Sequence, residues 1–184
     1  LLSHAKGEII FLLDSDDYFK KDKVRNVINA YKKNKNIDLI QTLPLIKNKN
    51  KLRKNKNKNN ILSYWPYFSP ESCLSFKRRF IKKFDEENQN FSNELEYKNV
   101  WLGFRLCIFS YFITKSFYSL NKNLTIYESQ GESKKYKIFG LNWFKRRLSS
   151  FNYLKKISKN KIDLNYNYDF LIKKIFIKFI KLFK

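Results

Sequence analysis

The chain has 184 residues, which is the size of one domain or of part of a larger one. Hydrophobic residues make up 43% of it and aromatic residues 18%, so it can bury a core and is not an entirely disordered chain. The net charge of +23 makes polyanions conceivable partners. The sequence has no RNP-like strand or zinc-ligand pattern, however, and we expect no specific nucleic acid partner.

The cysteine, histidine and methionine content gives expectations about the redox state of the thiols, about excluded kinds of site and about sequence upstream. Cys73 and Cys107 lie far apart and lack C-x-x-C spacing, so we expect each to be a buried free thiol in a reducing compartment. The single histidine, His4, argues against a His-based metal site and against a Ser-His-Asp triad. Methionine is absent and the opening strand has no preceding partner, so we expect further sequence upstream of Leu1.

The first predicted elements are a strand, a helix and a second strand. An apolar run predicts a buried strand at residues 8–13. Apolar residues at helical spacing predict a helix over residues 21–33, with Asp22 placed as its N-cap. Residues 37–46 have the composition of another strand, which we expect Pro44 to break.

The middle of the chain combines a polar loop with aromatic and basic segments. Residues 48–60 are almost entirely Lys and Asn, and we expect a surface loop because they have no apolar face to bury. An aromatic loop at 64–70 precedes a short strand at 72–76 and a basic helix at 77–84. A further helix is predicted over residues 94–111.

Two strands, at residues 115–120 and 124–128, are predicted around an Asn-Lys-Asn turn at 121–123. Residues 101–120 are apolar enough to suggest a membrane span, but basic and serine residues interrupt them. A buried helix followed by a strand is the interpretation that we prefer.

The C-terminal sequence YDFLIKKIFIKFIKLFK predicts a basic amphipathic helix from Tyr168. Its lysines fall on one side of the helix, and they are Lys173, Lys174, Lys178 and Lys181. Helices of this kind lie in membrane interfaces with their lysines toward anionic head groups. The alternative is a helix that docks on this domain. A weaker example of the same pattern begins at Trp143.

Three carboxylates follow the first strand, in the sequence Asp14-Ser15-Asp16-Asp17, which we call the Asp cluster. Hard divalent cations prefer oxygen ligands, and open α/β sheets bind ligands beyond the carboxyl ends of their strands. The alternative is a solvated turn with a helix cap. An EF-hand is excluded because Phe19 and Arg25 occupy its Gly and Glu positions. An aspartyl-phosphate motif is disfavoured because Gly and Thr do not follow Asp16.

The stretch A-K-G-E-I-I-F-L-L-D-S-D-D resembles the A-x-G-strand-D-x-D-D segment of family 2 glycosyltransferases, which have a GT-A fold. The resemblance implies an α/β fold: the C-terminal part of a GT-A, Rossmann-like domain at residues 1–135, followed by C-terminal helices in a basic amphipathic extension at 136–184. It implies that Asp14, Asp16 and Asp17 form the nucleotide-sugar site. Within this site Asp14 and Asp16 would hold Mg²⁺ or Mn²⁺, and Asp17 would be a supporting residue or cap.

Less specific parts of the resemblance concern the acceptor side. Glu94 aligns best with the family's catalytic base, and Glu96 is the alternative. Aromatic residues that could stack on sugar faces, or instead belong to the core, are Trp65, Tyr67 and Trp101.

The implied activity is inverting transfer of a sugar, of the hexosyltransferase type, from a nucleotide-diphospho-sugar to a hydroxyl of a saccharide or lipid-linked acceptor. Cell-envelope polysaccharide or glycolipid synthesis is the expected setting, in the cytoplasm and peripherally at the inner face of the membrane. We expect this fragment alone to be inactive. The alternative function is a non-catalytic, basic module that binds an anionic membrane surface.

Overall fold

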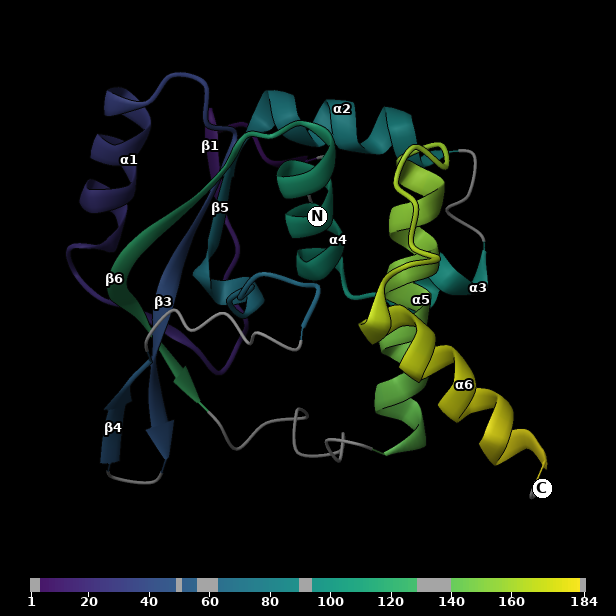
Figure 1. Ribbon diagram of the computed structural model, residues 1–184. Helices are drawn as coiled ribbons and strands as arrows, with labels where there is room; N and C mark the ends of the chain where they lie inside the picture. The colour runs from purple at the N-terminus through teal and green to yellow at the C-terminus, as the bar shows by residue number, and fades with distance from the viewer. Residues whose placement is uncertain (1–3, 49–50, 56–62, 90–93, 129–139, 183–184) are drawn as a thin grey trace.

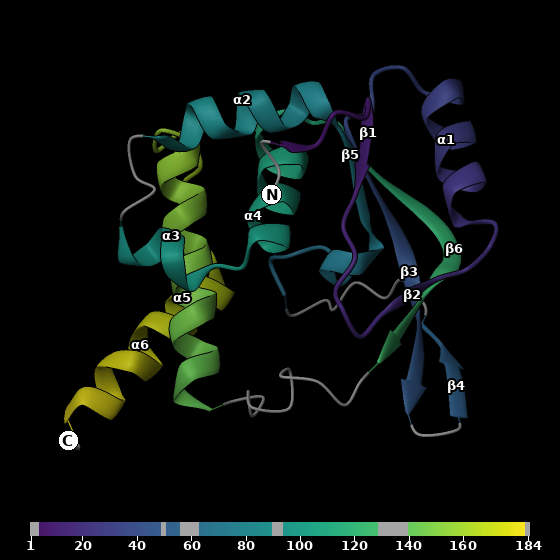
Figure 2. The ribbon, with the colours of Figure 1, turned by 180° about the vertical axis from the view of Figure 1, so that it is seen from behind.

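The computed structural model describes residues 4–48, 51–55, 63–89, 94–128 and 140–182. It is an α/β structure in which helices cover both faces of a mixed sheet (Figures 1 and 2). The strands are β1 Ile9–Phe11, β2 Tyr18–Phe19, β3 Leu39–Asn48, β4 Lys51–Lys54, β5 Leu74–Lys77 and β6 Phe117–Glu128. The helices are α1 Lys23–Lys33, α2 Arg78–Asn88, α3 Leu95–Asn99, α4 Leu102–Ile108, α5 Leu141–Ile157 and α6 Tyr168–Leu182.

The sheet has the strand order β1-β5-β3-β6-β2, and β4 pairs with the outer half of β3. β5 is antiparallel to both β1 and β3, while β3 and β6 are parallel. The carboxyl ends of β1, β3 and β6 therefore lie at one edge of the sheet. The segment between β1 and β2 crosses this edge, because these two strands lie at opposite ends of the strand order.

Two apolar layers hold the helices against the sheet. On one face, α1 buries Val27 and Tyr31 against Ile37 and Ile40. On the other, larger face, the core joins the sheet to α2, α4 and α5, and it includes Phe76, Phe80, Phe84, Phe109 and Phe151. The two cysteines, Cys73 and Cys107, are buried free thiols, as the sequence predicts.

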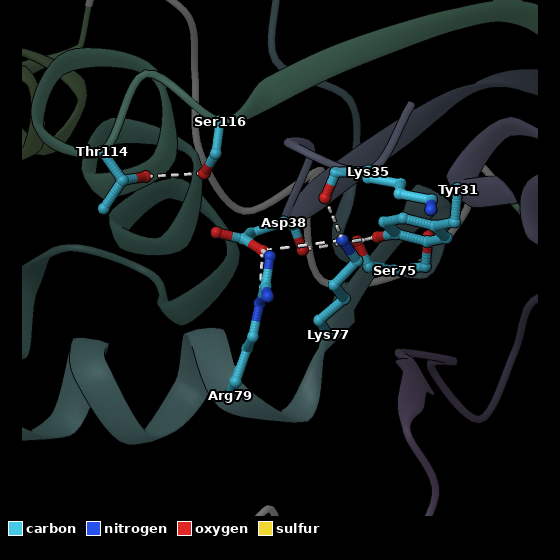
Figure 3. Close-up of polar contacts among 8 residues, drawn as sticks. All are labelled: Tyr31, Lys35, Asp38, Ser75, Lys77, Arg79, Thr114 and Ser116. Carbon is cyan, nitrogen blue, oxygen red and sulfur yellow. Dashed lines mark hydrogen bonds and ion pairs between the residues drawn. The ribbon is translucent and has the colours of Figure 1, made fainter. Parts of the chain in front are cut away.

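Polar contacts pin α1 and α2 to the sheet at the edge remote from the Asp cluster (Figure 3). The Tyr31 hydroxyl donates to the Ser75 carbonyl at 2.9 Å and thereby fastens α1 to β5. Asp38, just before β3, accepts two hydrogen bonds from Arg79 of α2, at 2.8 and 3.0 Å. Lys77 reaches the same carboxylate at 3.9 Å and donates to the Lys35 carbonyl.

The predicted turn at residues 121–123 is wrong, because β6 runs without interruption from Phe117 to Glu128. The additional residues form a bulge: the register against β3 shifts on both sides of Leu43. The expected break at Pro44 is also wrong, because β3 is continuous from Leu39 to Asn48. Pro44 lies at the register shift, where an irregular ladder tolerates a residue without an N–H. The Asn123 side chain also bonds across this bulge, because its amide donates to the Pro44 carbonyl at 2.8 Å.

Two other predictions also need correction. Residues 51–54, expected in a surface loop, form β4, because their backbone pairs with residues 45–48 of β3; positions 49–50 and 56–60 are outside the described residues. The single helix expected over residues 94–111 is instead divided into α3, α4 and a π-helical turn, Phe109–Ile113. Extended backbone at Val100 and Trp101 separates the first two.

The C-terminal helices α5 and α6 pack on the α4 side of the sheet (Figure 1). α6 contacts α5 through Phe176, which stacks on Phe144 at 4.1 Å, and through Phe170 against Phe151. Lys173, predicted on the solvent side, is buried and forms an ion pair with Asp169. In the part of the chain that the structure describes, no helix is both long and apolar enough to cross a bilayer.

Candidate functional site

The Asp cluster lies directly beyond the carboxyl end of β1. A turn closes where the Asp17 N–H donates to the Asp14 carbonyl at 3.1 Å. The Ser72 hydroxyl, in the 3-10 turn Glu71–Cys73 just before β5, accepts the Asp14 N–H at 2.9 Å and holds the turn against the sheet. Asp14, Ser15 and Asp16 are exposed, so two carboxylates face solvent at the edge where open α/β sheets bind ligands.

Asp17 differs from its two neighbours because it points into the protein. Its side chain is 4% exposed, and its carboxylate accepts the Glu128 N–H of β6 at 3.0 Å. Burial raises the pKa of Asp17, and the nearby carboxylates of Asp14 and Asp16 raise it further. Asp17 therefore ties the turn to β6, and its carboxylate does not face solvent as those of Asp14 and Asp16 do.

A buried lysine lies beneath the Asp cluster. The Lys23 side chain is fully buried, and its ammonium donates to the Ser72 carbonyl and, at 2.8 Å, to Thr125 Oγ1. The ammonium also lies 3.7 Å from the centroid of the Phe19 ring. Burial lowers the pKa of Lys23 to about 8, although the nearby Asp17 acts in the opposite direction.

Sequence reasoning missed Lys23, yet a signal was present. Lys23, Val27 and Tyr31 are the buried residues of α1, and they recur every four positions. The lysine thus begins the inward-facing stripe of the helix.

A second missed carboxylate, Glu71, joins the Asp cluster to α4. Its Oε1 accepts the Gly103 N–H in the first turn of α4 at 2.8 Å. Burial raises the pKa of Glu71 and the nearby Asp14 raises it further, while Arg105 lowers it. A methyl group at Gly103 would lie 2.5 Å from Glu71 Cγ, so glycine is required for this close approach.

The two residues predicted as catalytic base, Glu94 and Glu96, belong to α3 and its N-cap. Glu94 is the N-cap of α3 and forms an ion pair with Lys156 of α5. Both ribbon views place α3 on the side of α4 remote from the sheet (Figures 1 and 2). Glu96 belongs to α3, but its side chain is outside the described residues. The structure therefore does not bring Glu94 to the Asp cluster.

The three predicted acceptor aromatics have different environments. Trp65 is 3% exposed and packs on Phe151 with ring centroids 4.7 Å apart, so it is a core residue with no free face for a sugar. Tyr67 is half-buried, and its hydroxyl accepts a 2.6 Å hydrogen bond from Asn55. Trp101 is 55% exposed and is the most exposed of the three.

Trp101 lines a cavity of about 130 Å³ that we call the α4–α5 pocket. Its lining comes from the first turn of α4 and the residues before it, and from the first half of α5. The lining residues are Asn99, Val100, Trp101, Phe104, Trp143, Arg146, Arg147 and Ser150. The guanidinium carbon of Arg146 lies 4.6 Å from the centroid of the Trp101 ring.

The described residues do not gather three acidic, histidine or cysteine side chains around one metal position. The donor set at the Asp cluster is two exposed carboxylates, Asp14 and Asp16. Mg²⁺ is commonly held by one or two carboxylates together with substrate phosphates. This donor set therefore fits a cation whose coordination a diphosphate completes.

Comparison with known proteins identifies the family. Residues 1–112 match the family model described as "Glycosyl transferase family 2". No curated protein matches the chain. Among solved structures, the fold is similar to that of S. aureus TarS 1-349, crystallised in complex with UDP-GlcNAc, at 12% sequence identity and a TM-score of 0.51. The match covers 96% of this chain and 48% of TarS 1-349, so the chain spans about half the length of that structure. From the family match over more than half of its residues, we conclude that the chain belongs to glycosyl transferase family 2.

Proposed function

We propose that the chain is the part of an inverting glycosyltransferase that binds the diphosphate of a nucleotide-sugar and the acceptor. The observation that carries this proposal is the pair of exposed carboxylates, Asp14 and Asp16, held at the carboxyl edge of the sheet by Ser72. The presence of UDP-GlcNAc in the TarS complex supports a nucleotide-sugar as the donor class.

In this proposal, Asp14 and Asp16 hold Mg²⁺ or Mn²⁺ against the donor diphosphate. Such a cation, when bound, neutralises charge that develops on the leaving nucleoside diphosphate. Ser72 and Asp17 keep the carboxylates in place through the Asp14 N–H and through β6. The Lys23 ammonium in turn joins Ser72 to β6, because it donates to the Ser72 carbonyl and to Thr125 Oγ1.

Inversion also needs a base on the acceptor side, which removes a proton from the attacking hydroxyl. Glu94 and Glu96 remain the residues that the sequence predicts. Glu71 is a third candidate, because it lies between the Asp cluster and the α4–α5 pocket and because its pKa is raised toward the range useful for a base. Cell-envelope polysaccharide or glycolipid synthesis is the setting that we propose.

Calorimetric titration with UDP-GlcNAc and Mn²⁺ tests this function. We expect donor binding that requires Mn²⁺ and that falls at least about tenfold in Asp14→Asn and in Asp16→Asn, because each loses a charged metal ligand. Asp163→Asn, at an exposed carboxylate far along the chain, is the matched control. Absence of binding in the unmodified chain, or equal binding in all variants, would contradict the proposal.

A second proposal, suggested by α6, is peripheral association with the anionic cytoplasmic face of a membrane. Ile172, Ile175 and Phe179 are exposed on this helix, at 60, 65 and 56% respectively. Lys174 and Lys178 are exposed beside them, so the surface offers both apolar side chains and positive charge. The same surface supports the alternative of a non-catalytic membrane-binding module, which the donor titration distinguishes from an enzyme.

A further inference from the structure

The walls of the α4–α5 pocket combine positive charge with aromatic surface. Arg146 and Arg147 come from one side of α5, whereas Trp101 and Phe104 come from the first turn of α4 and its N-cap. Trp143, one turn before Arg147, completes the lining. The pocket thus combines two adjacent guanidinium groups with two tryptophan rings.

The charge around the pocket is predominantly positive. Arg147 forms no ion pair with any carboxylate that the structure describes, and burial lowers its pKa. Lys173 of α6 approaches the Trp143 ring to 5.4 Å. Burial lowers the pKa of Lys173 to about 8, and the nearby Arg147 lowers it further. The nearby carboxylate of Asp169 forms an ion pair with Lys173. A guanidinium that is desolvated without an anionic partner gains most from a ligand that supplies one.

Part of the aromatic surface that lines the pocket is exposed to solvent. Trp101 keeps 55% of its surface exposed, so its packing with Arg146 does not use up the ring. The guanidinium carbon of Arg147 lies 5.7 Å from the Phe104 centroid and 5.5 Å from the Trp143 centroid, so the charge lies close to both aromatic walls. An exposed aromatic face is a suitable platform for the apolar face of a sugar ring.

The size and position of the pocket connect it with the acceptor. A cavity of about 130 Å³ is much smaller than pockets for drug-sized ligands, so it suits one sugar unit better than a whole nucleotide-sugar. Two hydrogen bonds connect the α4 side of the pocket with the Asp cluster: the Gly103 N–H donates to Glu71, and the hydroxyl of the next residue, Ser72, accepts the Asp14 N–H. Its α5 wall lies outside residues 1–112, which match the family model.

We propose that the α4–α5 pocket binds an acceptor sugar that carries an anionic group, either a carboxylate or a phosphate. Arg146 and Arg147 bind the anion, and Trp101 and Trp143 contact the sugar ring. A guanidinium fork matches carboxylate and phosphate oxygens equally well in geometry, so the shared chemistry is an oxyanion on a sugar. The assignment of the ligand as an acceptor depends on the proposed transferase function.

The experiment is an NMR titration that follows the indole N–H signals of Trp101 and Trp143. The probes are methyl glucuronide, glucose 6-phosphate, neutral methyl glucoside and inorganic phosphate. We expect one or both anionic sugars to bind at least about tenfold more tightly than the neutral sugar, because each adds a charge-assisted pair. The comparison between the two anionic sugars distinguishes a carboxylate from a phosphate.

Variants locate the binding. Arg147→Gln should weaken binding of the anionic sugar by about tenfold, and Trp101→Ala, which removes an exposed ring, should weaken it without unfolding the chain. Arg25→Gln, at an exposed arginine of α1, is the matched control. Equal affinity for neutral and anionic sugars, inorganic phosphate that binds as tightly as the sugar phosphate, or anionic binding that survives Arg147→Gln would each overturn the proposal.

Donor binding, measured on the same sample with Mn²⁺ and UDP-GlcNAc, separates the two proposals. If the donor does not bind but the anionic sugars do, the transferase function fails and the pocket remains an anionic-sugar site. If the donor binds but the anionic sugars do not, the transferase function stands and the pocket assignment fails.

Discussion

Lys23 Nζ donates a 2.8 Å hydrogen bond to Thr125 Oγ1, across 102 positions of the chain. The same ammonium donates to the Ser72 carbonyl, and the Ser72 hydroxyl accepts the Asp14 N–H. The start of α1, the 3-10 turn before β5 and the end of β6 therefore meet beneath the Asp cluster. The position of the exposed Asp14 and Asp16 carboxylates therefore depends on the fully buried ammonium of Lys23.

The first prediction concerns the pH dependence of stability that Lys23 produces. Burial lowers its pKa to about 8 in the folded chain, whereas a lysine in an unfolded chain titrates near about 10.4. Between these values the unfolded state binds more protons, so this group makes the free energy of unfolding rise with pH. We expect a rise of roughly 3 kcal/mol between pH 8 and 10.5 that Lys23→Met lacks.

Urea unfolding across that pH range measures the effect as the difference between Lys23→Met and the unmodified chain. Taking the difference removes contributions of groups that do not interact with Lys23. Lys32→Met, at an exposed lysine of the same helix, should retain the unmodified profile. An identical profile for Lys23→Met would show that this ammonium is not desolvated.

The second prediction concerns the contact between Gly103 and Glu71. In Gly103→Ala, the new methyl group would lie 2.5 Å from Glu71 Cγ, and the carboxylate would have to leave the first turn of α4. We expect a loss of about 1–3 kcal/mol in the free energy of unfolding. Glu71→Ala relieves the clash, so Gly103→Ala should cost much less in that background. Additive effects in this double-mutant cycle would contradict the contact.

The third prediction concerns the exposed face of α6. In co-sedimentation with vesicles, Ile172→Asp/Ile175→Asp should reduce binding to anionic phosphatidylglycerol vesicles by at least about tenfold, because it removes apolar area and adds negative charge. Tyr166→Asp, which changes an exposed aromatic residue outside the helix, should bind like the unmodified chain. Unchanged binding of the double variant, or equal binding to neutral phosphatidylcholine vesicles, would argue against a membrane role for this surface.

Local patterns in the sequence were sufficient for part of the architecture. The apolar run before the Asp cluster indicated β1, and apolar residues at helical spacing indicated α1, of which Val27 and Tyr31 are buried. The position of Asp14 and Asp16 beyond the end of a strand followed from the same run. Each of these features depends on residues that are neighbours in the chain.

The errors arose where distant segments determine the outcome. Residues 121–123 have turn composition, but pairing with β3 keeps them in a bulged strand. Lys173 has the spacing of a solvent-facing lysine, but Asp169 and the packing of α6 on α5 draw it inside. Glu71 and Lys23 were missed because their partners, Gly103 and Thr125, lie 32 and 102 positions away.

The most direct test of the central claim uses Mn²⁺ as a paramagnetic probe in the presence of UDP. Bound Mn²⁺ broadens NMR signals of nearby nuclei, so the amide signals of residues 14–17 and of Ser72 should broaden first. Those of Arg79, at the opposite edge of the sheet, should stay sharp, and the effect should vanish in Asp14→Asn/Asp16→Asn. Broadening centred on the acidic residues of α2, or broadening that persists in the double variant, would contradict a donor site at the Asp cluster.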